Sequence, residues 1–141
     1  MNQKDFFAML GAPLVNVRWS WGAIREHDRT VFLRVWNDEV QTREGRQFVR
    51  VCRTASQVDS TNRGHRERVK RVDRVRGGAR CYLIMCTAVD PAVSARRVRQ
   101  FNAKDLFIGG AVEQFDDHWW IELLSAVSVD EVAAAPATEG A

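Results

Sequence analysis

Residues 80–88 read Arg-Cys-Tyr-Leu-Ile-Met-Cys-Thr-Ala, and six consecutive residues of this stretch are apolar. Turn signals stand on both sides of it, Gly77-Gly78 before and Asp90-Pro91 after. A short apolar run between turn signals is typical of a strand that is buried on both faces. We therefore expect residues 80–88 to form the central strand of a sheet, with the side chains of Cys81 and Cys86 on opposite faces.

The segment before this strand predicts a helix over residues 61–76. His65, Val69 and Val72 fall on one stripe of the helical wheel, while basic residues cover the opposite side. Gly77-Gly78 supplies the helix stop. On such a stripe His65 is expected to be a packed histidine.

Two hairpins are predicted farther out along the chain. The first joins a half-buried strand at 14–24, which alternates apolar and polar residues, to a strand at 30–36. The second joins 111–115 to 118–124 through Asp116-Asp117. The remaining expectations are a helix at 2–10, a polar segment at 37–46, a strand at 47–52, a loop at 53–64, a short strand at 96–101 and a connector at 103–108. Strands that do not alternate with helices favour an α+β fold, with a curled, mainly antiparallel sheet or small β-barrel and two helices.

The length of 141 residues corresponds to one domain. We expect this domain to span residues 1–128 and to be followed by a disordered, low-complexity tail at 129–141. The N-terminus lacks the layout of a secretory signal, and no apolar run approaches the length of a membrane span, so a cytoplasmic location is predicted. Three cysteines without C-x-x-C spacing indicate neither a disulfide framework nor a zinc site, and no cofactor motif is present.

Positive charge is concentrated in the middle of the chain. The net charge is only +3, but residues 46–99 hold 14 basic residues against four acidic ones. Most of the basic residues are arginines, whose planar guanidinium binds phosphate through two hydrogen bonds. This segment predicts a surface that contacts phosphates, although an acidic protein partner or a merely solvated face would also fit. The candidate phosphate-binding residues are Arg63, Arg66, Lys70, Arg71 and Arg74.

Tryptophans next to polar side chains suggest a pocket for a nucleobase. Trp36 ends a predicted strand and is followed by Asn37-Asp38-Glu39, while Ser20 and Trp21 lie on the strand expected to pair with it. Aromatic stacking with a few polar groups at the edge is what binding an unstacked base requires. The candidate pocket residues are Ser20, Trp21, Trp36 and Asp38, and each tryptophan could instead be part of the core.

The sequence contains no recognised catalytic motif. The three histidines are far apart, and the cysteines occupy apolar positions. Asp38 and Glu39 are the best paired carboxylates. With His118 they could hold a divalent metal, so a metal-dependent nuclease remains the second alternative.

The order of elements resembles the PUA-like superfamily of small β-barrels, which includes SRA, ASCH, EVE and YTH domains. The resemblance rests on residues 16–23, 31–39, 64–68 and 76–82, and it extends over roughly residues 14–127. Members of that superfamily commonly bind RNA or modified bases in DNA, and similar domains precede HNH-type nuclease modules in bacterial restriction-like proteins. The resemblance implies a reader of a modified base in restriction–modification or phage defence, with a flipped base between aromatic rings and arginines on the backbone.

Together these observations predict a non-catalytic domain that binds nucleic acid, with DNA favoured over RNA. The first alternative, from another class, is a small interaction or inhibitor protein, related to phage or defence, that binds an acidic protein partner.

Overall fold

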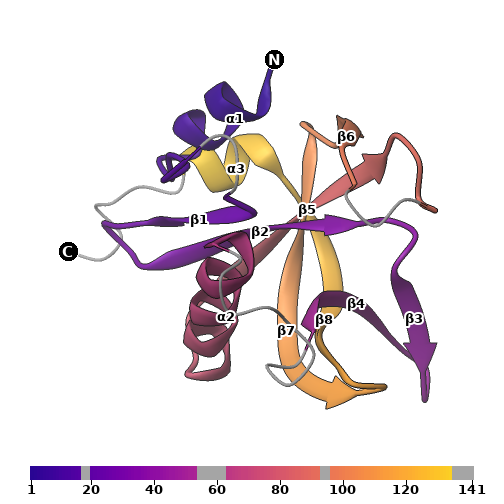
Figure 1. Ribbon diagram of the computed structural model, residues 1–141. Helices are drawn as coiled ribbons and strands as arrows, with labels where there is room; N and C mark the ends of the chain where they lie inside the picture. Colours follow the sequence, from indigo (N-terminus) through magenta and orange to yellow (C-terminus); the bar gives the residue numbers. More distant parts are fainter. Residues whose placement is uncertain (17–19, 54–62, 93–95, 135–141) are drawn as a thin grey trace.

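The computed structural model describes residues 1–16, 20–53, 63–92 and 96–134 (Figure 1). It is an α+β fold with one eight-stranded, curled sheet. The strands are β1 (Gly22–Arg25), β2 (Thr30–Trp36), β3 (Val40–Arg43), β4 (Arg46–Arg53), β5 (Cys81–Ala88), β6 (Val98–Phe101), β7 (Asp105–Phe115) and β8 (His118–Ser128). The helices are α1 (Gln3–Met9), α2 (Arg63–Arg76) and α3 (Val129–Ala134).

Strand β5 is central, as its apolar run predicts. The order across the sheet is β1-β2-β5-β7-β8-β4-β3, and β6 also pairs with β5. Six of the seven strand pairings are antiparallel, while β2 and β5 run parallel. The path of strands has two ends, β1 and β3, so the described strands form a curled sheet, and the predicted alternative of a small closed barrel is not realised.

Alternation along the central strands supplies two cores. In β5 the side chains of Cys81 and Leu83 belong to one core, and those of Ile84 and Cys86 belong to the other. Period-two alternation of apolar residues on both faces is why this stretch reads as continuously apolar. Cys81 and Cys86 thus face opposite sides, as predicted.

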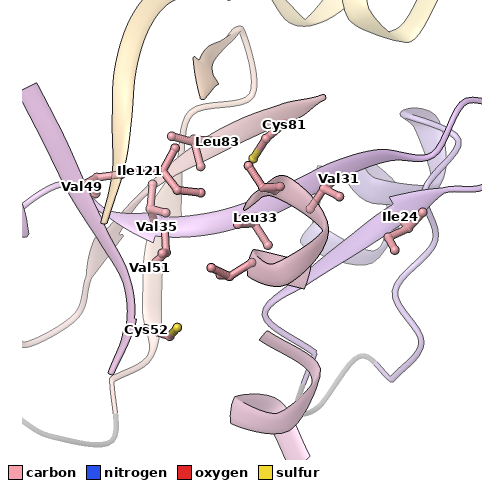
Figure 2. Close-up of a cluster of buried hydrophobic side chains, with 12 residues drawn as sticks. Ile24, Val31, Leu33, Val35, Val49, Val51, Cys52, Cys81, Leu83 and Ile121 are labelled. Atoms are coloured by element: carbon pink, nitrogen blue, oxygen red, sulfur yellow. The ribbon is translucent and has the colours of Figure 1, made fainter. Parts of the chain in front are cut away.

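The first core lies between the sheet and α2 (Figure 2). Its buried residues are Ile24, Val31, Leu33, Val35, Val49, Val51, Cys52, Val72, Val75, Cys81, Leu83 and Ile121. The second core lies between the opposite face of the sheet and helices α1 and α3, which lie side by side in Figure 1. Its buried residues are Phe6, Phe7, Leu10, Ala12, Ala23, Phe32, Ile84, Cys86, Leu106, Val129 and Val132.

The first predicted hairpin forms, but its first strand is much shorter than expected. Strand β1 begins at Gly22, and residues 17–19 lie outside the described part of the chain. Gly22 approaches β2 so closely that a Cβ atom there would lie 2.2 Å from the carbonyl oxygen of Phe32. All four residues of β1 are buried, so the prediction of a half-buried strand over 14–24 was wrong in both extent and exposure.

Two other segments contain strands that the sequence did not predict. The polar segment 37–46 includes β3, whose side chains are mostly exposed at the edge of the sheet. The expected connector at 103–108 is the beginning of β7, which pairs with β8 over 11 residues. An edge strand with one exposed face carries little apolar signal, which explains why β3 reads as a loop.

The end of the domain also differs from the prediction. Residues 129–134, expected to belong to a disordered tail, form α3, and Val129 and Val132 are buried in the second core. The described part of the chain therefore contains three helices, which are the two predicted ones, α1 and α2, and the short α3. Residues 135–141 lie outside the described part of the chain. Among the described residues, no helix combines the length and apolar character needed to cross a membrane.

Candidate nucleic-acid interface

Helix α2 presents a row of basic side chains to solvent. Arg66, Lys70 and Arg74 are all exposed, and their spacing of four residues places them on one face of the helix. None of the three forms an ion pair with another residue in the described part of the chain. We call these three residues the α2 row. Its positive charge is therefore available to a partner.

The other two predicted phosphate-binding residues of α2 are placed differently. Arg71 lies at the flank of the helix, with its side chain only 14% exposed, and forms an ion pair with Glu67 at 3.7 Å. Burial lowers the pKa of the Arg71 guanidinium, and the carboxylate of Glu67 opposes this shift. The side chain of Arg63 lies outside the described part of the chain.

The inner face of α2 carries one residue that the sequence interpretation missed. His65 is 6% exposed, as predicted for a packed histidine, but Arg68 is buried as well, at 5%. Its Nη2 donates a hydrogen bond to the carbonyl oxygen of Arg34 in β2. Burial lowers the pKa of Arg68 to about 10, because no solvent stabilises its charge. Position 68 is three residues after His65 and four before Val72, so the helical period alone places it on the buried stripe.

Ser20 and Trp21 are anchored to α2. The Ser20 hydroxyl donates a hydrogen bond to Oε2 of Glu67 at 3.0 Å, and Ser20 is 1% exposed. The Trp21 ring lies edge-on to the ring of His65, with their centroids 6.4 Å apart. The guanidinium of Arg68 is 5.7 Å from the Trp21 ring centroid, a cation–π contact. These contacts fix the start of β1 against the helix.

Trp36 and Asp38 form a separate group with Arg96. The Arg96 guanidinium donates two hydrogen bonds to the Asp38 carboxylate, at 2.7 and 2.9 Å, and lies over the Trp36 ring at 5.5 Å. This arrangement ties the end of β2 to the segment that leads into β6. Trp36 also packs against the second core.

The four predicted pocket residues therefore form two separate pairs: Ser20 and Trp21 contact α2, whereas Trp36 and Asp38 contact Arg96. The ladder between β1 and β2 ends at the pair Gly22–Leu33, so Trp36 lies three residues beyond its last rung. The prediction of a shared pocket depended on pairing of 15–24 with 30–36, and the described pairing covers only the start of β2. None of the four residues lines either of two surface hollows, one beside β6 at the end of β2 and one between the tips of the β3–β4 and β7–β8 hairpins.

The carboxylates considered for a metal site are each paired with an arginine. Asp38 is held by Arg96, and Glu39 forms an ion pair with Arg50. His118 contacts Arg50 as well, with 3.4 Å between its Nε2 and Nη1 of the arginine. Across the described residues, no three His, Cys, Asp or Glu side chains come together as metal ligands would.

The three cysteines are buried thiols within the fold. Burial raises the pKa of Cys52 and Cys86 to about 11 and that of Cys81 to about 12, with Arg68 opposing each shift. A thiol needs to be a thiolate to act as a nucleophile. These side chains therefore act as small apolar groups of the two cores.

Comparison with known proteins gives no relative from which to assign a function. No protein-family model, no curated protein and no solved structure matches the chain. The similarity to the PUA-like superfamily stays a prediction from the sequence.

Proposed function

We propose that this protein is a non-catalytic nucleic-acid-binding domain, and that the α2 row is its contact with phosphates. The observation that carries the proposal is the row itself: three exposed cations on one helix face without an intramolecular counter-ion among the described residues. Successive members are separated by four residues, which is about 6 Å along a helix axis. That is close to the advance of two nucleotides along one strand of DNA.

Contrast with the other basic residues of α2 supports this choice of contacts. Arg71 is paired with Glu67, and Arg76 is paired with Asp73 at 3.3 Å. Arg76 also lies over the Trp119 ring at 4.4 Å. These residues have structural partners within the fold, whereas the α2 row has none in the described part of the chain. Phosphate contacts of this kind give affinity and orientation but no base specificity.

The test measures the salt dependence of binding. Fluorescence anisotropy with labelled duplex DNA, single-stranded DNA and RNA of the same sequence, at several salt concentrations, gives the slope of log K against log salt. Each of Arg66→Gln, Lys70→Gln and Arg74→Gln is expected to weaken binding to every sequence and to reduce that slope by about one unit. DNA is expected to bind more tightly than RNA.

Lys4→Gln is the matched control, because Lys4 is an exposed cation on α1, across the sheet from α2. It should leave both the affinity and the slope unchanged. The proposal is wrong if wild-type protein binds no nucleic acid at low salt, or if the α2 variants and the Lys4 variant change the slope equally.

A further inference from the structure

A hollow of about 320 Å³ lies beyond the end of β2, beside β5, β6 and the first half of β7. Its apolar lining comes from Met85, Phe101 and Phe107, all of them half-buried. Met85 and Phe107 pack against the first core, while Phe101 packs against the second. The volume lies at the lower end of the range of about 300–1,000 Å³ that is typical of small-ligand sites. The hollow is therefore large enough for a small ring and has side chains on which a ring can stack.

The polar lining is uncharged. It consists of the amides of Asn37, Gln100 and Asn102 and the hydroxyl of Thr87, and none of the described residues that line the hollow carries a charge. Thr87 and Gln100 lie directly opposite each other in the β5–β6 ladder. A site without charge offers nothing to offset the desolvation of an ionic ligand. The lining therefore favours a neutral ligand.

Local hydrogen bonds use only part of this polar lining. The Asn37 amide nitrogen donates to the Thr87 hydroxyl at 2.9 Å. The Asn102 side-chain oxygen accepts hydrogen bonds from the backbone N–H groups of Lys104 and Asp105, at 2.9 and 3.0 Å. These bonds hold the side chains of Asn37 and Asn102 in place.

The oxygen of Asn37, the amide nitrogen of Asn102 and the whole amide of Gln100 have no hydrogen-bond partner among the described residues. The hollow therefore presents both donors and acceptors beside apolar side chains, which is the complement of a heterocycle with an amide-like edge.

We propose that this hollow binds one unpaired nucleobase of a strand whose phosphates contact the α2 row; this proposal rests on the function proposed above. The base would lie against the apolar side chains of the hollow, and the amide groups would contact its edge. Helix α2 leads into the start of β5, whereas the hollow lies near its other end. The eight residues of β5 extend about 25 Å. An oligonucleotide of roughly seven nucleotides or more would therefore be needed to reach both the α2 row and the hollow.

The closing experiment compares single-stranded 12-mers that carry one of the four bases, or an abasic site, at each position in turn. Wild-type protein is expected to bind one base at a single position at least tenfold more tightly than the abasic site. Gln100→Leu should reduce that preference at least fivefold, because it removes the exposed amide of the hollow and leaves the α2 row intact. Gln47→Leu, a change of an exposed glutamine on β4, is the control and should keep the preference.

Failure of the two proposals gives different results. If abasic and intact oligonucleotides bind equally while Arg66→Gln still lowers the salt slope, the α2 row binds nucleic acid and the hollow does not hold a base. If no oligonucleotide binds, the function proposed above is wrong. Calorimetric titration with the four free nucleosides then tests whether the hollow binds a base. Nucleoside binding that is lost in Gln100→Leu would retain the hollow as a base site, whereas no binding would end the proposal.

Discussion

Two buried arginines illustrate how differently one residue type can be accommodated in this fold. Arg25 is 1% exposed, and its guanidinium donates to the carbonyl oxygens of Val132 (2.7 Å) and Leu10 (3.3 Å) and to both oxygens of Asp28. Leu10 follows α1 and Val132 lies in α3, so one cation joins both helices to the β1–β2 turn. Arg68, by contrast, has buried Nε and Nη1 atoms that find no hydrogen-bond partner among the residues that the structure describes.

The two arginines should respond in opposite ways to replacement by methionine. Arg25→Met leaves the Asp28 carboxylate and two carbonyl groups without their partner, and we expect it to lower the free energy of unfolding by about 3–5 kcal/mol. Arg68→Met removes a desolvated charge and retains most of the volume, and we expect it to raise that energy by about 1 kcal/mol. Urea denaturation of both variants measures the difference. Equal destabilisation would show that Arg68 is as well accommodated as Arg25.

Asp28 also shows how the surroundings of a single residue change its acid chemistry. Burial opposes ionisation of Asp28, but hydrogen bonds from Arg25 and Thr30 outweigh it and lower the pKa of this carboxylate to about 2. A depressed pKa in the folded state stabilises the protein above the unfolded value of 3.8. This contribution is lost as the pH falls from about 4 towards 2, when Asp28 begins to accept a proton in the folded protein too.

At the scale of elements, alternation of apolar and polar residues predicts where a strand lies. It does not predict where the pairing of that strand with its neighbour ends. Residues 30–36 form β2 with the predicted bounds. Alternation at 15–21 indicates a strand equally well, but among the described residues the pairing with β2 ends where the Arg34 N–H donates to the carbonyl of Trp21. In a complete rung this Arg34 carbonyl would accept the N–H of Trp21, but it accepts a hydrogen bond from Arg68 instead. A competing donor 34 residues away cannot be recognised from local periodicity.

The turn of the β7–β8 hairpin is another element with a testable feature. Asp116 and Asp117 both have positive φ angles, 50° and 62°. The β3–β4 turn places Glu44 and Gly45 at the same two positions, with φ angles of 53° and 77°. Two-residue hairpin turns with two positive φ angles favour glycine, above all at the second position.

We therefore expect Asp117→Gly to stabilise the protein by about 0.5–1 kcal/mol, because it relieves the strained backbone at this position. Asp117→Ala is the control, since it removes the carboxylate but keeps a Cβ atom, and it should not stabilise. Thermal denaturation followed by circular dichroism distinguishes the two. If both variants stabilised equally, repulsion between adjacent carboxylates would be the cause rather than the backbone.

At the scale of the whole molecule, the sequence predicts the fold class but only part of the candidate site. Composition and the apolar run at 80–88 indicate a curled α+β sheet. Both are properties of the local sequence, so the fold class can be predicted from it. The α2 row follows from helical period in the same way. The hollow brings together Asn37, Thr87 and Gln100 from three parts of the chain, and their proximity depends on the β5–β6 register. No local pattern encodes that register.

The two cores share β2 and β5, so we expect the molecule to unfold as one cooperative unit. Val72 is buried in the first core at 2%, and Val132 is buried in the second, also at 2%. Val72→Ala and Val132→Ala should each lower the free energy of unfolding by about 2 kcal/mol, through lost apolar burial and the cavity left behind.

Cooperativity is measured from the unfolding curves of these two variants. Because a strand common to both cores cannot lose one face and keep the other intact, circular dichroism and tryptophan fluorescence should give a single coincident midpoint for each variant. Glu131→Ala, an exposed change on α3, should leave the midpoint unchanged. A lower circular dichroism midpoint with an unchanged fluorescence midpoint in Val132→Ala alone would mean that the layer of α1 and α3, which contains no tryptophan, unfolds separately.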